Sequence, residues 1–254
     1  SDAEMAAFLV DERRLYRGTA ACVVQPSSTE QVCAIVRLCR AENYAIVPQG
    51  GNTGYCGGAT PDSNRQVLLS LSRLNQVRDL DPISFTATVE AGVILAQLQE
   101  VAAGHDLFFP LSMGSEGSCQ IGGNLSTNAG GLAVLRYGTA RELRPGLEVV
   151  LPDGEILNLL SPLRKDNTGY ELKSLFMGAE GTLGIITAAV VKLFPAPSEQ
   201  QTAWLAVRNP ASACQLLAMA RKLSGDTVTS FEYISQASLD LVAQHITAVH
   251  LPFT

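Results

Sequence analysis

The sequence lacks the features that mark nucleic-acid-binding, membrane-spanning or disulfide-rich proteins. Lys and Arg (18) are outnumbered by Asp and Glu (24), giving a net charge of −6, whereas duplex binding relies on basic side chains. No uninterrupted apolar run reaches the roughly 18 residues of a transmembrane helix, and the N-terminal residues do not read as a signal peptide. The six cysteines form no C-x-x-C pair, which favours reduced thiols over disulfides or zinc. We expect a soluble, intracellular protein.

Lysine is also missing from the most unusual stretch of the chain, residues 46–58, which read IVPQGGNTGYCGG. A Walker loop ends in Gly-Lys-Ser/Thr, and a Rossmann fingerprint reads G-x-G-x-x-G, so this stretch is neither. Its five glycines permit positive φ, and successive N–H groups, with the hydroxyl of Thr53, could hold a diphosphate. A glycine-rich hairpin or Ω-loop without a ligand is the alternative. The stretch alone does not separate the two.

Two further glycine clusters follow. Residues 110–131 contain six glycines together with many Ser, Thr and Asn residues, but they lack the prolines and charges of a solvated linker. Apolar side chains punctuate this region, so we expect an ordered binding loop rather than a disordered linker. Residues 177–195 read as a glycine-punctuated turn followed by a long β-rich strand.

The hydrophobic fraction of 46% and the charged fraction of 17% indicate a globular chain, and its pattern is α+β. Ser28 and Gln31 form a capping box at the start of the first predicted helix. The predicted helices cover residues 27–43, 94–103, 210–223 and 235–249. The predicted strands cover residues 22–26, 45–48, 66–71, 77–80, 85–90, 142–151, 155–159, 203–207 and 228–234, with a turn at Pro152, Asp153 and Gly154.

The three glycine clusters in this order, with PQGGNTG, IGGNLSTNAGG and KDNTGYELK, resemble the FAD-linked oxidases of the vanillyl-alcohol oxidase type. The similarity covers about residues 20–250. It points to the branch that contains D-2-hydroxyglutarate dehydrogenase, bacterial D-lactate dehydrogenase and the glycolate oxidase D subunit. The resemblance implies an FAD-binding domain over residues 1–197, with subdomains at about 18–71 and 72–197. Residues 198–254 would begin a ferredoxin-like cap domain that the sequence leaves incomplete.

The resemblance also implies which residues bind FAD. The pyrophosphate would lie on the backbone amides of Gly50, Gly51, Asn52, Thr53 and Gly54. The ribityl chain and isoalloxazine would be lined by Pro110, Leu111, Gly114, Ser115, Ser118, Gly122, Asn124, Thr127, Asn128 and Gly130. Glu180, Gly184 and Ile185 would lie along the adenosine or ribityl side. Members of this group that attach FAD covalently use a histidine in or near these loops. Here the first loop has none, and we expect ordinary packing roles for His105 and Cys119, so the FAD would be noncovalent.

Oxidation of a 2-hydroxy acid by flavin needs a base for the hydroxyl proton and cations for the carboxylate. In the resembling proteins these groups, and a divalent metal, belong to the cap domain, where the base is a histidine of an H-x-H-type motif. Since this sequence stops short of that motif, we assign no catalytic residue. His245 and His250 are expected to be solvated, Arg136 and Arg141 to be surface charges, and Lys165 and Asp166 to pair or cap near the turn at residues 167–169.

The expected activity is FAD-dependent oxidation of D-2-hydroxyglutarate or D-lactate, with electrons passed to an electron-transfer flavoprotein or quinone. A non-catalytic flavin-carrying module that needs a cap from another chain is the alternative, because the chain is either a fragment or a natural subunit. A reductase of a nucleotide-sugar enol ether shares the fold, but the KDNTGYELK match weighs against it. The location would be cytoplasmic, or the mitochondrial matrix in a eukaryote. The oligomeric state is left open.

Overall fold

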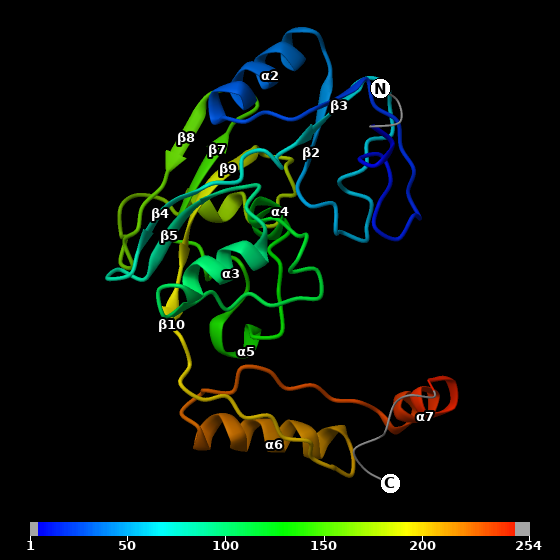
Figure 1. The fold of residues 1–254 in the computed structure, drawn as a ribbon, viewed down its shortest axis with the longest axis vertical. Helices are drawn as coiled ribbons and strands as arrows, with labels where there is room; N and C mark the ends of the chain where they lie inside the picture. Colours follow the sequence, from blue (N-terminus) through cyan, green and yellow to red (C-terminus); the bar gives the residue numbers. More distant parts are fainter. Residues whose placement is uncertain (1–4, 247–254) are drawn as a thin grey trace.

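The computed structural model describes residues 5–246, which form a mixed α/β body with a separate helical segment at its C-terminal end (Figure 1). The body contains a three-stranded parallel sheet in the order β1-β3-β2 and a five-stranded antiparallel sheet in the order β4-β5-β9-β7-β8. The strands are β1 (Cys22–Val24), β2 (Ala45–Gln49), β3 (Gln66–Ser70), β4 (Val77–Asp81), β5 (Thr86–Glu90), β7 (Gly146–Val150), β8 (Ile156–Leu159) and β9 (Ile185–Lys192). This confirms the α+β prediction.

The first helix, α2 (Thr29–Ala41), joins the two sheets. Ser28 caps it by accepting a hydrogen bond from the backbone N–H of Gln31 at 3.3 Å. The Gln31 side chain accepts from the N–H of Ser27 rather than from that of Ser28, so the predicted capping box is displaced by one residue. The apolar face of α2 packs in one cluster with β3, with Val150 of β7 and with Ile185 of β9. The position of each sheet is thus fixed against the same helix.

Two helices cover the other face of the antiparallel sheet (Figure 1). They are α3 (Leu95–Ala103) and α4 (Ile121–Ser126), and they share the main apolar cluster with β5, β7 and β9. Every residue of β7 and nearly every residue of β9 is buried, as expected for central strands covered on both sides. The short helix α5 (Val134–Tyr137) follows α4. Its Tyr137 ring packs edge-on against Phe194 of β10 (Phe194–Pro195), which pairs with β6 (Leu107–Phe108).

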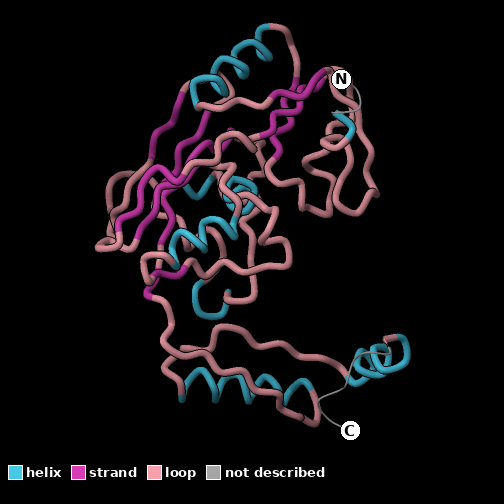
Figure 2. Tube along the Cα trace, in the orientation of Figure 1, coloured by secondary structure: helices cyan, strands magenta, loops and turns pink. Residues whose placement is uncertain are grey.

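The predictions beyond residue 197 were half right. The helices α6 (Pro210–Leu223) and α7 (Gln236–His245) confirm that both predicted helices exist. The second ends at His245, since Ile246 is already extended, and residues 247–249 of the predicted helix lie outside the described range. The strands predicted at residues 203–207 and 228–234 are wrong, because both segments are loop (Figure 2). A strand is stabilised by pairing with neighbours, and the described residues give these two segments no partner strand.

Candidate functional site

The first and second glycine clusters lie against each other. A Cβ atom placed on Gly51 would overlap the carbonyl oxygen of Ser118, and one on Gly50 would come within 3.5 Å of the backbone of Gly123. The two chain segments therefore approach as closely as backbones can, which only glycine allows. This contact joins β2, on the parallel sheet, to the start of α4, on the antiparallel sheet.

The third glycine cluster, which begins at residue 177, contacts both of the other two. The N–H of Glu180 donates to the carbonyl of Ser126 at 3.0 Å, and a Cβ on Gly181 would overlap the ring of Pro48. Glu180 has a positive φ of 52°, and its carboxylate would lie 3.2 Å from a Cβ on Gly58. Three loops that are far apart in sequence thus meet at the ends of β2, α4 and β9.

Several predicted binding residues use their side chains to hold the loops together. Asn52 donates to the carbonyl of Val10 at 2.7 Å, Thr127 donates to the carbonyl of Gly123 at 2.9 Å, and the Asn124 amide lies 3.6 Å from the Cys119 sulfur. Asn128 accepts from the backbone N–H of Arg141 at 3.0 Å. These side chains shape the loops, which leaves backbone groups as the main candidates for contact with a ligand.

The other predicted binding residues differ in how much of their surroundings is filled. Leu111 and Gly122 are buried in the interior behind the loops, and Pro110 is buried beside them. At Gly54 and Gly114, by contrast, a Cβ would meet nothing within 4 Å. The remaining predicted positions, at Thr53, Ser115, Ser118, Gly130, Gly184 and Ile185, lie on the same three loops.

Arg141 and Arg144 hold the chain segment of residues 171–177, which leads into the third glycine loop. Arg141 donates to the carbonyls of Ser174 and Met177 at 3.0 and 2.9 Å, so the prediction that it is a surface charge was wrong. Arg144 is buried and pairs with Glu171 at 3.1 Å. Burial lowers the pKa of Arg144, and the Glu171 carboxylate offsets this in part.

A charged cluster links strands of the antiparallel sheet to the start of α2. Arg78 of β4 lies 3.2 Å from Glu90 of β5 and 3.4 Å from Glu148 of β7. The Glu148 carboxylate also accepts from Thr29, the first residue of α2, and from Thr187 of β9, each at 2.8 Å. Burial acts to lower the pKa of Arg78, but the two carboxylates outweigh it and raise the pKa overall. The sequence signal for this cluster, a glutamate within the apolar run GLEVV, was not recognised.

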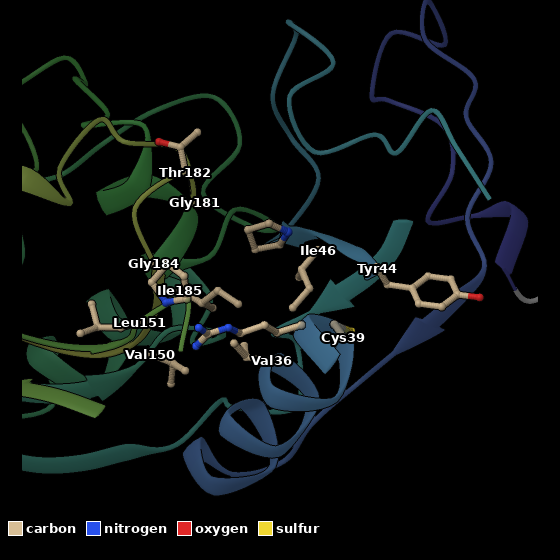
Figure 3. Close-up of a pocket in the computed structure, with 13 residues that line it drawn as sticks. Val36, Cys39, Tyr44, Ile46, Val150, Leu151, Gly181, Thr182, Gly184 and Ile185 are labelled. Atoms are coloured by element: carbon tan, nitrogen blue, oxygen red, sulfur yellow. The ribbon is translucent and has the colours of Figure 1, made fainter. Parts of the chain in front are cut away.

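A cavity of about 320 Å³ opens between α2, β2 and the third loop (Figure 3). Its walls are mostly apolar, and Arg40 is the one charged residue among those that line it. Gly184 and Ile185, both predicted binding residues, form one wall, and Ile46 of β2 lies across from them (Figure 3). Tyr44, in the turn before β2, also lines the cavity, but its ring points away from Gly184 and Ile185. The lining residues are Val36, Cys39, Arg40, Tyr44, Ile46, Pro48, Val150, Leu151, Pro152, Gly181, Thr182, Gly184 and Ile185.

The loops have the properties that FAD requires. Among residues 5–246, no atom fills the space beside Gly54 and Gly114, and none is a hydrogen-bond partner for the buried Gln120 Oε1, which lies 3.6 Å from a Cβ placed on Gly50. An unpaired buried acceptor is costly, and its position at the junction of the first two loops suits a donor on a bound ligand. The residues present therefore fit a dinucleotide that lies along all three loops.

The predictions for the histidines, for the charged residues outside the glycine loops and for Cys119 are confirmed only in part. His105 is exposed in the turn between α3 and β6, so the expectation that its side chain has a packing role was wrong. Asp166 caps the turn as expected, by accepting from the backbone N–H of Thr168 at 3.2 Å, but it pairs with Lys173 at 3.2 Å rather than with Lys165. Arg136 lies over the ring of Tyr137, and Cys119 is buried as expected. His245 is exposed at the end of α7, and His250 lies outside the described residues.

The described range 5–246 contains neither a helix suited to span a membrane nor a cluster suited to bind a metal ion. None of its helices has both the length and the apolar character needed to span a bilayer. None of its clusters of His, Cys, Asp and Glu is arranged to hold a metal ion.

Comparison with known families and structures gives consistent results. The family described as FAD binding domain matches residues 20–160. Among solved structures, alkyldihydroxyacetonephosphate synthase superposes with a TM-score of 0.63 at 30% identity, covering 70% of this chain and 32% of that one.

The similar curated proteins are longer than this chain. D-2-hydroxyglutarate dehydrogenase, mitochondrial, from Bos taurus is 43% identical over 93% of this chain and 43% of its own length. The D-2-hydroxyglutarate–pyruvate transhydrogenase of Saccharomyces cerevisiae is 38% identical over 98% of this chain and 50% of its own length. The chain thus spans about half the length of the relatives it matches.

Proposed function

Because this chain belongs to the FAD binding domain family, we propose that it is the flavin-binding part of an FAD-dependent dehydrogenase that oxidises a D-2-hydroxy acid to the 2-oxo acid. The observation that carries the proposal is the meeting of three glycine loops around open backbone at Gly54 and Gly114. The names of the relatives at 38–43% identity support 2-hydroxyglutarate as the substrate, with D-lactate as the second candidate.

The diphosphate of FAD would lie on the amides of residues 50–54. Glycine-rich backbone of this kind makes an anion nest in which each charge-assisted hydrogen bond contributes about 1.5–3 kcal/mol. The adenosine would enter the cavity between α2 and the third loop, where Gly184 and Ile185 present apolar surface. The ribityl chain and isoalloxazine would lie along the second loop, over residues 110–130. We propose noncovalent attachment, since the described part of the first loop contains no histidine.

When bound, FAD would supply the acceptor for the hydrogen and two electrons that leave C2 of the substrate. The residues of this chain bind the dinucleotide, orient it through the three loops and exclude water from its buried side. We propose that the base for the hydroxyl proton and the cations for the substrate carboxylate come from outside residues 5–246. Within that range the two histidines, His105 and His245, are both exposed, the first in a turn and the second at the end of α7. A divalent metal would belong to that same cap.

We propose the domain boundaries given by the sequence, with subdomains at about 18–71 and 72–197 and a cap that begins near residue 198. The electron acceptor would be an electron-transfer flavoprotein or a quinone. We propose the mitochondrial matrix as the location if the source is a eukaryote and the cytoplasm otherwise; the word mitochondrial in the names of the eukaryotic relatives supports the first.

The test is an anaerobic titration of the intact purified protein. We expect a yellow protein whose flavin absorption is bleached by D-2-hydroxyglutarate or D-lactate but not by the L-enantiomers, and whose FAD is released by denaturation. A yellow protein that no 2-hydroxy acid bleaches would favour a flavin-carrying module that another chain completes. A colourless protein that takes up no added FAD would overturn the proposed use of all three loops.

A further inference from the structure

We propose that Asn52 and Gln49 are positioning residues for the diphosphate, which act by tying the first glycine loop to a hairpin formed by residues 8–18. The proposal rests on the proposed function, since it assigns a role in binding FAD to residues whose side chains face away from the ligand. The hairpin itself was not predicted from the sequence, because it is short and has no apolar periodicity.

The hairpin is built around one buried carboxylate. Asp11, which is 3% exposed, accepts from the backbone N–H of Tyr16 at 2.6 Å and from that of Arg13 at 3.2 Å. These bonds close a tight turn in which Arg14 has a positive φ of 58°. Beyond the turn, the N–H of Gly18 donates to the carbonyl of Leu9 at 2.8 Å. The hairpin therefore has a fixed shape of its own.

Four contacts join the hairpin to the first loop. Gln49, only 2% exposed, donates at once to the carbonyl of Phe8 at 2.9 Å and to that of Ala59 at 3.0 Å, so it closes the base of the loop. Asn52 donates to the carbonyl of Val10 at 2.7 Å. The Arg13 guanidinium lies 3.8 Å above the ring of Tyr55, and the Tyr16 ring packs directly on Gly57.

These contacts explain how the backbone N–H of Asn52 can be held ready to bind the diphosphate. Asn52 has a positive φ of 54°, a conformation that costs free energy in a residue with a side chain. Its bond to Val10 holds it there. A loop already held in its bound shape loses less conformational entropy when the ligand binds, so the hairpin raises the affinity for FAD without touching it.

The experiment is a double-mutant cycle in the intact protein, read as the dissociation constant for FAD. Asn52→Gly removes the amide donor but keeps the positive φ, and Asp11→Ala removes the centre of the hairpin turn. We expect each variant to weaken FAD binding by about tenfold, and the double variant to be little weaker than either one, because both break the same link. Asp81→Ala is the matched control, since Asp81 closes the β4–β5 turn by accepting from Ile83 and Ser84; it should leave FAD binding unchanged.

Hydrogen exchange supplies a second readout that simple destabilisation would not give. Because coupling between two sites is reciprocal, FAD should slow exchange of the Tyr16 and Gly18 amides in the wild-type protein and do so less in Asn52→Gly. If Asp11→Ala does not fold, Asn52→Gly and the exchange data decide. Wild-type affinity for FAD in both variants, or hairpin amides whose exchange rate does not change when FAD binds, would overturn the proposal while leaving the proposed function intact. A wild-type protein that binds no FAD would instead overturn both.

Discussion

At Gly51 the backbone of the first loop passes so close to Ser118 that a methyl group would overlap its carbonyl oxygen. Gly51→Ala should therefore push the first loop away from the second, lowering the free energy of unfolding by about 1–3 kcal/mol and weakening FAD binding by more than about tenfold. Thermal melts and an FAD titration measure both effects. Gly104→Ala, at the end of α3 and outside the three loops, is the control, because its φ is −61° and a Cβ there makes only ordinary contacts, at 3.5 and 3.8 Å. Equal melting temperatures for the two variants would contradict the close contact.

Glu142 should make the melting temperature depend on pH. Its carboxylate accepts from the N–H and hydroxyl of Thr139 at 2.7 and 2.6 Å, and these bonds hold its pKa below the ordinary value although burial opposes them. A carboxylate with a lowered pKa stabilises the fold above its unfolded pKa of about 4.3 and loses this contribution as the pH falls through the folded pKa.

The measurement is the melting temperature of wild type and Glu142→Gln between about pH 3 and pH 7. The difference should be largest above about pH 5 and should shrink below about pH 4. Glu100→Gln, on the exposed side of α3 and with no hydrogen bond to its carboxylate among the described residues, is the control. A Glu142→Gln difference that stays constant over this range would show that the hydrogen bonds from Thr139 do not favour the charged form.

Among the elements, those with strong local signals were predicted and those that depend on distant partners were not. The cap at Ser28 and the turn at residues 152–154 locate α2 and the β7–β8 hairpin, because each signal acts within a few residues. Helix α4 was missed, since Gly122 and Gly123 are poor helix formers and its helix is held by packing against β5 and β9. The three loops were identified from glycine content, but their meeting is a property of the tertiary structure.

The charged cluster between α2 and the antiparallel sheet allows a prediction about this helix and the strands it covers. Glu148→Ala would leave Arg78 without its main partner and Thr29 without its acceptor. Thr187 would keep only its longer bond, of 3.4 Å, to the backbone carbonyl of residue 148. We expect a loss of about 3 kcal/mol in the free energy of unfolding, at the low end for a buried pair because the Arg78 side chain is 29% exposed.

The control for this element prediction is Glu155→Ala. Glu155 pairs with Arg37 at 3.3 Å and so joins the same helix to the β7–β8 turn, but both side chains are more than half exposed. Its removal should cost no more than about 1 kcal/mol. Denaturant unfolding of both variants measures the difference, and similar losses would mean that the Arg78 cluster contributes no more than a surface pair.

On the scale of the whole molecule, the FAD-binding part and the segment after residue 197 are built differently. Large apolar side chains in the latter remain exposed, among them Trp204 (58%), Leu205 (59%) and Leu223 (79%), whereas Ala213 of α6 is buried. The three loops, the cavity and the hairpin at residues 8–18 all lie before residue 197. The segment therefore contributes little of the core that supports the proposed FAD site.

A chain ending at Pro197 should consequently bind FAD with a dissociation constant within about threefold of that of the longer chain, because the backbone nest is unchanged. A chain ending at Lys192 should bind less well and melt lower, because it also loses Leu193, which is buried in the main core, and Phe194, whose ring packs 4.7 Å from that of Tyr137. Titrations with FAD and thermal melts of the two truncated chains separate these outcomes. If the chain ending at Pro197 took up no FAD, the segment beyond it would be part of the flavin site, and the proposed boundary near residue 198 would have to be abandoned.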